Sequence, residues 1–189
     1  MTKKRGESYI LEDGQAKLLD FPDVRQSNGF TCGCDSLLAV LYYYGLSYRE
    51  DRLAKLIKTD EEGTAPQPIV ALCRKLGFKV DVGKMTLKKL KGYVDRSVPV
   101  IVVYQAWQDK PSSWKDDYED GHYSVVIGYD NNNLILEDPS MLNKGYIPVE
   151  EFLERWHDID KHGRKYQNLG IAVYGKKPKY DSLLIKKIE

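Results

Sequence analysis

The chain has 189 residues, a length that predicts one domain able to bury a core of its own. Its 29 basic and 28 acidic residues give a net charge of +1, so nothing in the overall field favours a nucleic acid or an anionic membrane as partner. Three cysteines do not suggest a disulfide framework. Reduced thiols fit a reducing compartment. The sequence shows no membrane span and no signal-peptide pattern, so we expect a cytoplasmic protein without membrane insertion.

A loop that runs into an apolar helix is the most informative stretch of the chain. Residues 1–25 predict an edge strand or arm, which leads into a loop of small polar side chains. From Cys32 to Gly45 the apolar residues recur close to every 3.6 positions, which predicts a helix that begins at the cysteine and ends at the glycine. A thiol at a helix start lies near the positive end of the helix dipole, which favours its nucleophilic thiolate form.

Gln26 is the second polar residue of interest in this stretch. It lies six residues before Cys32, close enough for its amide to fold back and donate a hydrogen bond to a developing oxyanion. A structural interpretation is also open, in which Cys32 is a small buried hydrophobe and Gln26 is a solvated loop residue.

The middle of the chain predicts three more helices and the centre of a sheet. Residues 47–50 and 64–67 have the spacing of capping boxes, and a further helix begins at Thr86. Cys73 falls on an apolar helix face, where a packed structural thiol is expected. The run 98–104 is continuously apolar and β-branched, as in a strand that is covered on both faces.

A hairpin in the second half of the chain carries a histidine and an acid. Strands at 122–130 and 134–138 flank a turn of three asparagines, so His122 and Asp138 lie toward the same open end. A three-residue turn would pair Asp138 with Val126, about 13 Å along the strand from His122. We therefore expect a bulge or a strong twist to bring the two side chains together.

His122 is the best candidate for a general base among the three histidines. His157 and His162 follow a predicted helix in a polar segment that has the character of a solvated turn, whereas His122 begins a buried strand. A hydrogen-bonded core histidine is the alternative interpretation of His122. The polar residues 106–121 predict a long surface loop, with two tryptophans that either rim a cleft or cover the sheet.

The remaining segments complete what we expect to be a single domain over residues 1–189. We expect a strand at 145–147, a helix at 149–156 and a last strand at 169–174. The tail 176–189 is basic but short, which predicts a solvated end rather than a binding surface.

The ordered motifs resemble one known family. A glutamine, then Cys-Gly opening an apolar helix, then Gly-His-Tyr-Ser-Val-Val-Ile-Gly-Tyr-Asp and Glu-Asp-Pro-Ser, are similar to the papain-like leader peptidases that process bacteriocin precursors, the double-glycine peptidase family. The resemblance covers about residues 24–157. The sixteen-residue step from His122 to Asp138 also resembles the step from histidine to asparagine in papain-like enzymes generally.

The resemblance implies a fold, an activity and four functional residues. The fold would be α+β and papain-like, with a helical half packed on a mainly antiparallel sheet. The activity would be that of a cysteine peptidase acting on a peptide or protein, with Cys32 as nucleophile, His122 as base and then acid, Asp138 as orienting carboxylate and Gln26 as oxyanion donor. No cofactor and no metal are implied. Cleavage after Gly-Gly is inherited from the family, and we expect a free-standing member because these 189 residues contain no fused ATPase or membrane segment.

Two residues depart from the family's pattern, which usually has proline or another small residue and then alanine after Cys-Gly. This chain has Cys34 and Asp35, and an acid in the first turn suits the helix dipole but opposes ionisation of a neighbouring thiol. Cys34 should point away from Cys32, because helical residues face neighbours three and four positions away. A Cys32–Cys34 zinc pair is a weak alternative that lacks two ligands.

Two other functions stay open. The same triad supports acyl transfer to an amine, or deamidation, when water is not the acceptor. A peptide-binding module on this fold would grip a leader segment without cutting it, although such members generally lose the cysteine. The sequence favours no particular oligomeric state.

Overall fold

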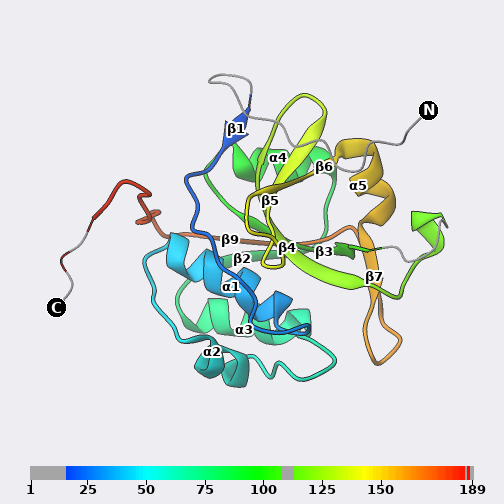
Figure 1. The fold of residues 1–189 in the computed structure, drawn as a ribbon, viewed down its shortest axis with the longest axis horizontal. Helices are drawn as coiled ribbons and strands as arrows, with labels where there is room; N and C mark the ends of the chain where they lie inside the picture. The colour runs from blue at the N-terminus through cyan, green and yellow to red at the C-terminus, as the bar shows by residue number, and fades with distance from the viewer. Residues whose placement is uncertain (1–15, 108–112, 186, 188–189) are drawn as a thin grey trace.

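A computed structural model describes residues 16–107, 113–185 and 187 of the chain. In Figure 1 the helices α1, α2 and α3 lie together below the central strands β2, β3, β4 and β9, and α4 and α5 lie above these four strands. The elements are β1 (Lys17–Leu18), α1 (Cys32–Tyr43), α2 (Glu50–Leu56), α3 (Pro66–Lys75), β2 (Lys79–Lys84), α4 (Leu87–Val94), β3 (Val100–Gln105), η1 (Trp114–Asp116), β4 (Gly121–Tyr129), β5 (Asn133–Glu137), β6 (Gly145–Pro148), α5 (Val149–Arg155), β7 (His157–Ile159), β8 (Lys165–Gln167) and β9 (Leu169–Tyr174).

One antiparallel sheet organises these elements. Its order is β2-β9-β3-β4-β5-β6, and β1 pairs with β4 off this path. All residues of β3 are buried inside the sheet, which confirms the strand predicted at 98–104. Helices packed on a mainly antiparallel sheet confirm the predicted α+β fold.

The β7–β8 hairpin corrects the expectation of a solvated turn around His157. The two strands form a separate two-stranded sheet, and the His157 side chain is buried. Its Nε2 lies 2.8 Å from the carbonyl oxygen of Trp114, and its ring lies 4.6 Å from the ring of Tyr118. These partners come from a distant part of the chain, so the polar sequence around His157 does not reveal its burial.

Helix α1 confirms the helix predicted from Cys32. Residues 32–41 are all buried, and Gly45 follows with a φ of 77°, a conformation that favours glycine. Cys73 is buried on α3. In the part of the chain that the structure describes, no helix combines the length and apolar character needed to cross a bilayer.

The expected capping groups serve two different purposes. Thr86, where the sequence predicts a helix to begin, caps α4 by accepting a hydrogen bond from the third residue after it at 3.2 Å. The two predicted capping boxes are wrong. Glu50 instead accepts a hydrogen bond from the Ser27 hydroxyl at 2.6 Å, and the hydroxyls of Thr64 and Thr59 lie 2.8 Å apart. These side chains therefore tie loops together rather than cap helices.

The β4–β5 register brings Asp138 closer to His122 than a three-residue turn would. The turn is one residue longer than expected, and a β-bulge after Val126 shifts the pairing by one more residue. Asp138 therefore lies beside Ser124, with 3.0 Å between hydroxyl and carboxylate. The expected bulge is confirmed, and the expected pairing of Asp138 with Val126 is wrong.

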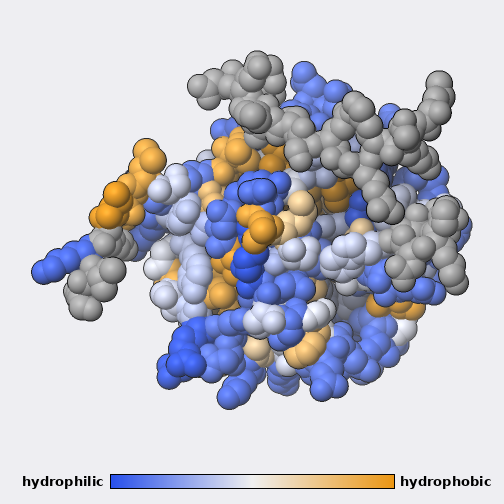
Figure 2. All heavy atoms as spheres, in the orientation of Figure 1, coloured by the Kyte–Doolittle hydropathy of each residue, from blue (hydrophilic) through white to orange (hydrophobic). Residues whose placement is uncertain are grey.

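Hydrophilic residues dominate the face of the molecule that Figure 2 shows. Apolar residues form separate groups on this face, one of which lies on the C-terminal tail. In the tail, Leu183, Leu184 and Ile185 are exposed.

Candidate active site

Cys32 is the first residue of α1 and opens onto a cavity. Its side chain is 8% exposed and lines a cavity of about 160 Å³. The first backbone N–H groups of a helix have no partner within the helix, and they carry the positive end of its dipole. Negative charge on the sulfur, or on an oxygen beside it, is therefore stabilised at this position.

His122 lies between Cys32 and Asp138. The imidazole is 1% exposed, and its Nε2 lies 2.8 Å from Oδ1 of Asp138. Burial alone would lower the pKa of His122, but hydrogen bonds to Asp138 and Cys32, together with the negative charges of these groups, raise it to about 9. The site therefore favours an imidazolium ion beside the sulfur of Cys32.

Four further donors surround the Asp138 carboxylate. Burial would raise the pKa of Asp138, but the hydrogen bond and positive charge of His122, with the hydrogen bonds from Ser140, lower it far below its ordinary value. The carboxylate therefore stays ionised and holds the imidazole in one orientation. Its other donors are Tyr104 Oη at 3.0 Å, Ser124 Oγ at 3.0 Å, Ser140 N at 2.8 Å and Ser140 Oγ at 2.6 Å.

The two tryptophans of the 106–121 segment occupy different places. The Trp107 ring lies 4.8 Å from the ring of His122 and is half exposed, so it rims the site. Trp114 lies under the guanidinium of Arg155, 4.3 Å from its ring centre, so it packs against α5 instead. Trp107 therefore fits the interpretation that it rims a cleft, whereas Trp114 packs on a helix and fits neither interpretation.

Gln26 is fixed to the segment that follows Asp138. Its backbone N–H donates to the carbonyl of Pro139 at 2.9 Å, and its side-chain Nε2 donates to the carbonyl of Asn28 at 2.9 Å. The amide has a second hydrogen on Nε2 that this bond does not use. The structure therefore brings Cys32, His122 and Asp138 together, while the Gln26 amide is engaged within its own loop.

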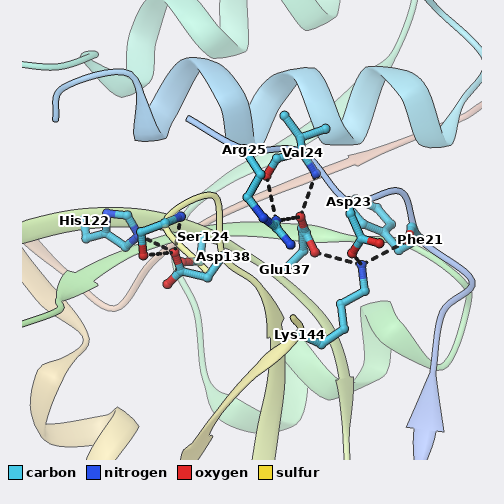
Figure 3. A network of polar contacts seen from close by, with 10 residues as sticks. Phe21, Asp23, Val24, Arg25, His122, Ser124, Glu137, Asp138 and Lys144 are labelled. Atoms are coloured by element: carbon cyan, nitrogen blue, oxygen red, sulfur yellow. Dashed lines mark hydrogen bonds and ion pairs between the residues drawn. The ribbon is translucent and has the colours of Figure 1, made fainter. Parts of the chain in front are cut away.

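Glu137, next to Asp138, anchors the segment before Gln26. Figure 3 shows the two carboxylates pointing apart, that of Asp138 toward His122 and that of Glu137 toward Arg25 and Lys144. Glu137 is 1% exposed and accepts three hydrogen bonds, from Val24 N at 2.9 Å, Arg25 Nη1 at 3.3 Å and Lys144 Nζ at 2.7 Å. The end of β5 therefore supports both the imidazole and the Gln26 loop.

Cys34 and Asp35, which follow Cys32 on α1, are both buried. The Cys34 thiol lies 3.8 Å from the carbonyl oxygen of Glu50 in α2, and burial, with the charges of Asp35 and Glu50, raises its pKa to about 12. Burial is the main cause that raises the pKa of Asp35 to about 7. The Thr31 hydroxyl lowers this pKa, and the negative charge of Glu50 raises it further. Within residues 16–107, 113–185 and 187, no three His, Cys, Asp or Glu side chains form a group able to hold a metal ion.

We expect Asp35→Asn to stabilise the fold more at pH 8 than at pH 4. The folded pKa of about 7 exceeds the ordinary 3.8, so the folded state holds this proton more tightly and the free energy of unfolding falls as pH rises between these values. Removing the charge should raise the free energy of unfolding at pH 8 by about 1–3 kcal/mol. Urea denaturation of both proteins at the two pH values tests this, and equal differences at both would contradict it.

Comparisons with known proteins point to one family. The profile described as the Peptidase C39 family matches residues 20–159. An uncharacterized protein of Methanothermobacter marburgensis is 30% identical over 118 residues, which are 62% of this chain and 71% of that protein. The transport/processing ATP-binding protein ComA of Streptococcus pneumoniae is 32% identical over 139 residues, which are 71% of this chain and 17% of that protein.

Solved structures show the same fold. The peptidase domain of Streptococcus ComA is 28% identical with a TM-score of 0.59, and the match covers 79% of this chain and 95% of that domain. A putative C39-like peptidase from Bacillus anthracis is 20% identical with a TM-score of 0.65, over 86% of this chain and 98% of the other. A double glycine motif protease from an AMS/PCAT transporter, solved with the leader peptide, is 19% identical with a TM-score of 0.61, over 86% and 94%.

Proposed function

Because this chain belongs to the peptidase C39 family, we propose that it is a cysteine peptidase whose reaction is carried by Cys32, His122, Asp138 and Gln26. One observation carries the proposal. A buried imidazole lies between an ionised carboxylate at 2.8 Å and a thiol at the start of a helix. This is the arrangement that an activated sulfur nucleophile requires.

In the proposed mechanism, the Cys32 thiolate attacks the carbonyl carbon of a peptide bond. The carbonyl oxygen becomes an oxyanion, which the backbone N–H of Cys32 and the free Nε2 hydrogen of Gln26 stabilise. The His122 imidazolium then protonates the leaving amine as the C–N bond breaks, and a thioester to Cys32 remains. The neutral imidazole takes a proton from water, whose oxygen attacks the thioester and releases the acid and the thiolate.

Asp138 and Gln26 act in this scheme through orientation and charge. Asp138 stabilises the imidazolium and fixes the ring through Nε2, which leaves Nδ1 for the sulfur. The Gln26 backbone is held by Pro139, and in this scheme its side chain turns its second amide hydrogen toward the oxyanion at Cys32.

We further propose that the substrate is a peptide with small residues, such as Gly-Gly, next to the cleaved bond. A related structure of the same fold contains a leader peptide bound to a double glycine motif protease. In this chain, the cavity beside Cys32 holds about 160 Å³, well below the roughly 300–1,000 Å³ of typical ligand pockets. A small cavity at the reacting sulfur favours small side chains.

A peptide panel tests this function. Peptides carrying Gly-Gly, Ala-Ala or Leu-Leu in one common sequence are incubated with the protein in ¹⁸O water, with and without an added amine, and analysed by mass spectrometry. We expect cleavage after Gly-Gly with ¹⁸O in the new acid. Amide products would favour acyl transfer, and a bound but uncut peptide would favour a binding module.

Alkylation separates the proposed nucleophile from the two other thiols. Cys34 and Cys73 are buried and their pKa values are raised to about 12, chiefly by burial, so both are almost entirely protonated at pH 7. Iodoacetamide should therefore modify Cys32 at least about 100-fold faster, because only thiolates react. Peptide mapping after timed quenching gives the three rates. A rate for Cys32 no higher than that for Cys73 would rule out Cys32 as the nucleophile.

A further inference from the structure

The cavity beside Cys32 lies between two segments that are far apart in the sequence. One wall is formed by the connection from α2 to α3 and the first residue of α3, and the other by the β7–β8 hairpin together with Gly121 and Tyr123 of β4. Figure 1 shows the α2–α3 connection and this hairpin reaching toward each other on the same side of the molecule. The helical half of the protein carries the first segment, and the sheet half carries the second.

An ion bridge joins these two walls. Nζ of Lys161, in the hairpin turn, lies 2.7 Å from Oδ2 of Asp60 and 3.1 Å from Oε2 of Glu62. A second contact runs alongside, in which Gln67 Nε2 donates to Tyr166 Oη at 3.4 Å. Lys161, Asp60 and Glu62 all line the cavity that Cys32 also lines, so their bridge joins two walls of that cavity.

We infer that the Lys161 bridge closes one side of the substrate cleft and that Lys161 is a specificity-determining residue, which restricts substrates to small side chains in this cavity. The inference rests on the proposed function and adds a cause for its selectivity. A peptide that places a large side chain in the cavity must separate Lys161 from Asp60 and Glu62, whereas a glycine need not.

The strength of the bridge suits a closure that opens and closes. The three side chains are 40%, 53% and 64% exposed, and ion pairs between exposed groups are weak and screened by salt. The bridge therefore biases selection among substrates and does not block the site. High salt should weaken the closure in the native protein.

Charge gives a competing account that variants can separate from closure. Removing Lys161 makes the cavity more acidic, while removing Asp60 and Glu62 makes it less acidic. If closure controls selectivity, both changes admit larger side chains. If charge controls it, the two changes act in opposite directions on basic and acidic side chains. The charged side chains that line the cavity are Lys58, Lys161, Asp60, Glu62, Asp158 and Asp160.

The experiment compares Lys161→Ala, the double variant Asp60→Asn/Glu62→Gln, and their combination. Lys165→Ala is the matched control, because Lys165 lies in the same hairpin over the Tyr118 ring and outside the cavity lining. kcat/KM is measured for peptides that carry Gly, Leu, Lys or Glu at one of two positions. These are the residue directly before the cleaved bond and the residue directly after it. Thermal melts confirm that the variants are folded.

We expect Lys161→Ala and the double variant each to raise kcat/KM for Leu peptides about 3–10-fold, on one side of the bond only. Gly peptides should change less than about twofold, and the combined variant should add nothing further. In 1 M NaCl the native protein should approach the selectivity of Lys161→Ala. Unchanged selectivity in both variants, or opposite changes for Lys and Glu peptides, would overturn the inference while leaving the peptidase function in place.

A second measurement keeps the inference testable if no peptide is cleaved, a result that would count against the proposed function alone. Cys32 is alkylated with iodoacetamide and with a bulky maleimide. Lys161→Ala should raise the maleimide rate about 3–10-fold and leave the iodoacetamide rate unchanged, whereas Lys165→Ala should change neither. Equal maleimide rates in native protein and Lys161→Ala would overturn the inference.

Discussion

Replacing Cys32 by alanine should lower kcat/KM for peptide cleavage by at least about 10⁴-fold, because the thioester of the proposed mechanism cannot form without the sulfur. The other two cysteines provide matched controls. Cys34 faces α2, and Cys73 is buried on α3, so neither thiol is part of the proposed reaction. Cys34→Ala and Cys73→Ala should keep kcat/KM within about threefold, with a stability loss of about 1 kcal/mol from each small cavity.

The measurement is cleavage of a Gly-Gly peptide, followed by mass spectrometry, with urea denaturation for each variant. Stability data matter because a variant that unfolds also loses activity. Cys32 is at the edge of the core, so Cys32→Ala should unfold at nearly the same urea concentration as the native protein. A loss of kcat/KM in Cys32→Ala much smaller than about 10⁴-fold would exclude the proposed mechanism.

Local sequence patterns are sufficient for the elements that carry the three central groups. Helix α1 follows from apolar periodicity and a terminal glycine, so the place of Cys32 at a helix start follows as well. The hairpin of β4 and β5 follows from two β-branched runs around asparagines, which sets His122 and Asp138 at one end. Such signals are local, because they depend on neighbours within one or two turns of the chain.

The partners of these groups do not follow from local patterns. Tyr104 reaches Asp138 from β3, and no pattern in β3 distinguishes its hydroxyl from that of any other buried tyrosine. The contact between Ser124 and Asp138 follows from the hairpin register alone. That register depends on the β-bulge, whose position the sequence does not show. The buried His157 depends on Trp114 and Tyr118, which belong to a segment without a usable period.

The partners of Glu137 are the clearest example of contacts that local sequence patterns do not predict. Its carboxylate binds the backbone of Val24, which is 113 positions away in the sequence, and the side chain of Lys144. A glutamate next to Asp138 in the sequence has the appearance of a surface residue. Only the tertiary fold shows that Glu137, Asp138 and Pro139 each hold a different part of the site, namely the segment before Gln26, the imidazole and the Gln26 backbone.

Asp138 helps to raise the pKa of His122, so its substitution should change the pH dependence of the proposed reaction. The pKa of His122 is raised to about 9 in part by the hydrogen bond and charge of Asp138. In Asp138→Asn the amide oxygen still accepts from Nε2, and the hydroxyls of Tyr104 and Ser124 can turn to accept from the new amide group. The geometry therefore persists while the negative charge is lost, and the pKa of His122 must fall.

The alkaline limb of the kcat/KM profile reports loss of the imidazolium proton of His122. It should lie near pH 9 in the native protein and at least about one pH unit lower in Asp138→Asn. At pH 7 we expect kcat/KM to fall about 10–100-fold in Asp138→Asn and about 10³-fold in Asp138→Ala, where the ring also loses its acceptor. Rates from pH 5 to 10, with proton NMR of the imidazole, measure both effects.

Stability should change with pH in a matching direction. The folded pKa of His122 lies above the ordinary 6.5, so the stabilisation that the proton brings is complete below pH 6.5 and is lost as pH rises to about 9. The stability difference between native protein and Asp138→Asn should therefore shrink over that range. Glu137→Gln is the matched control, because it removes the neighbouring carboxylate, which binds Val24, Arg25 and Lys144 instead of His122. It should lower stability and leave the alkaline limb in place. A limb that shifts equally in both variants would show that general negative charge, rather than the Asp138 hydrogen bond, sets the proton affinity of His122.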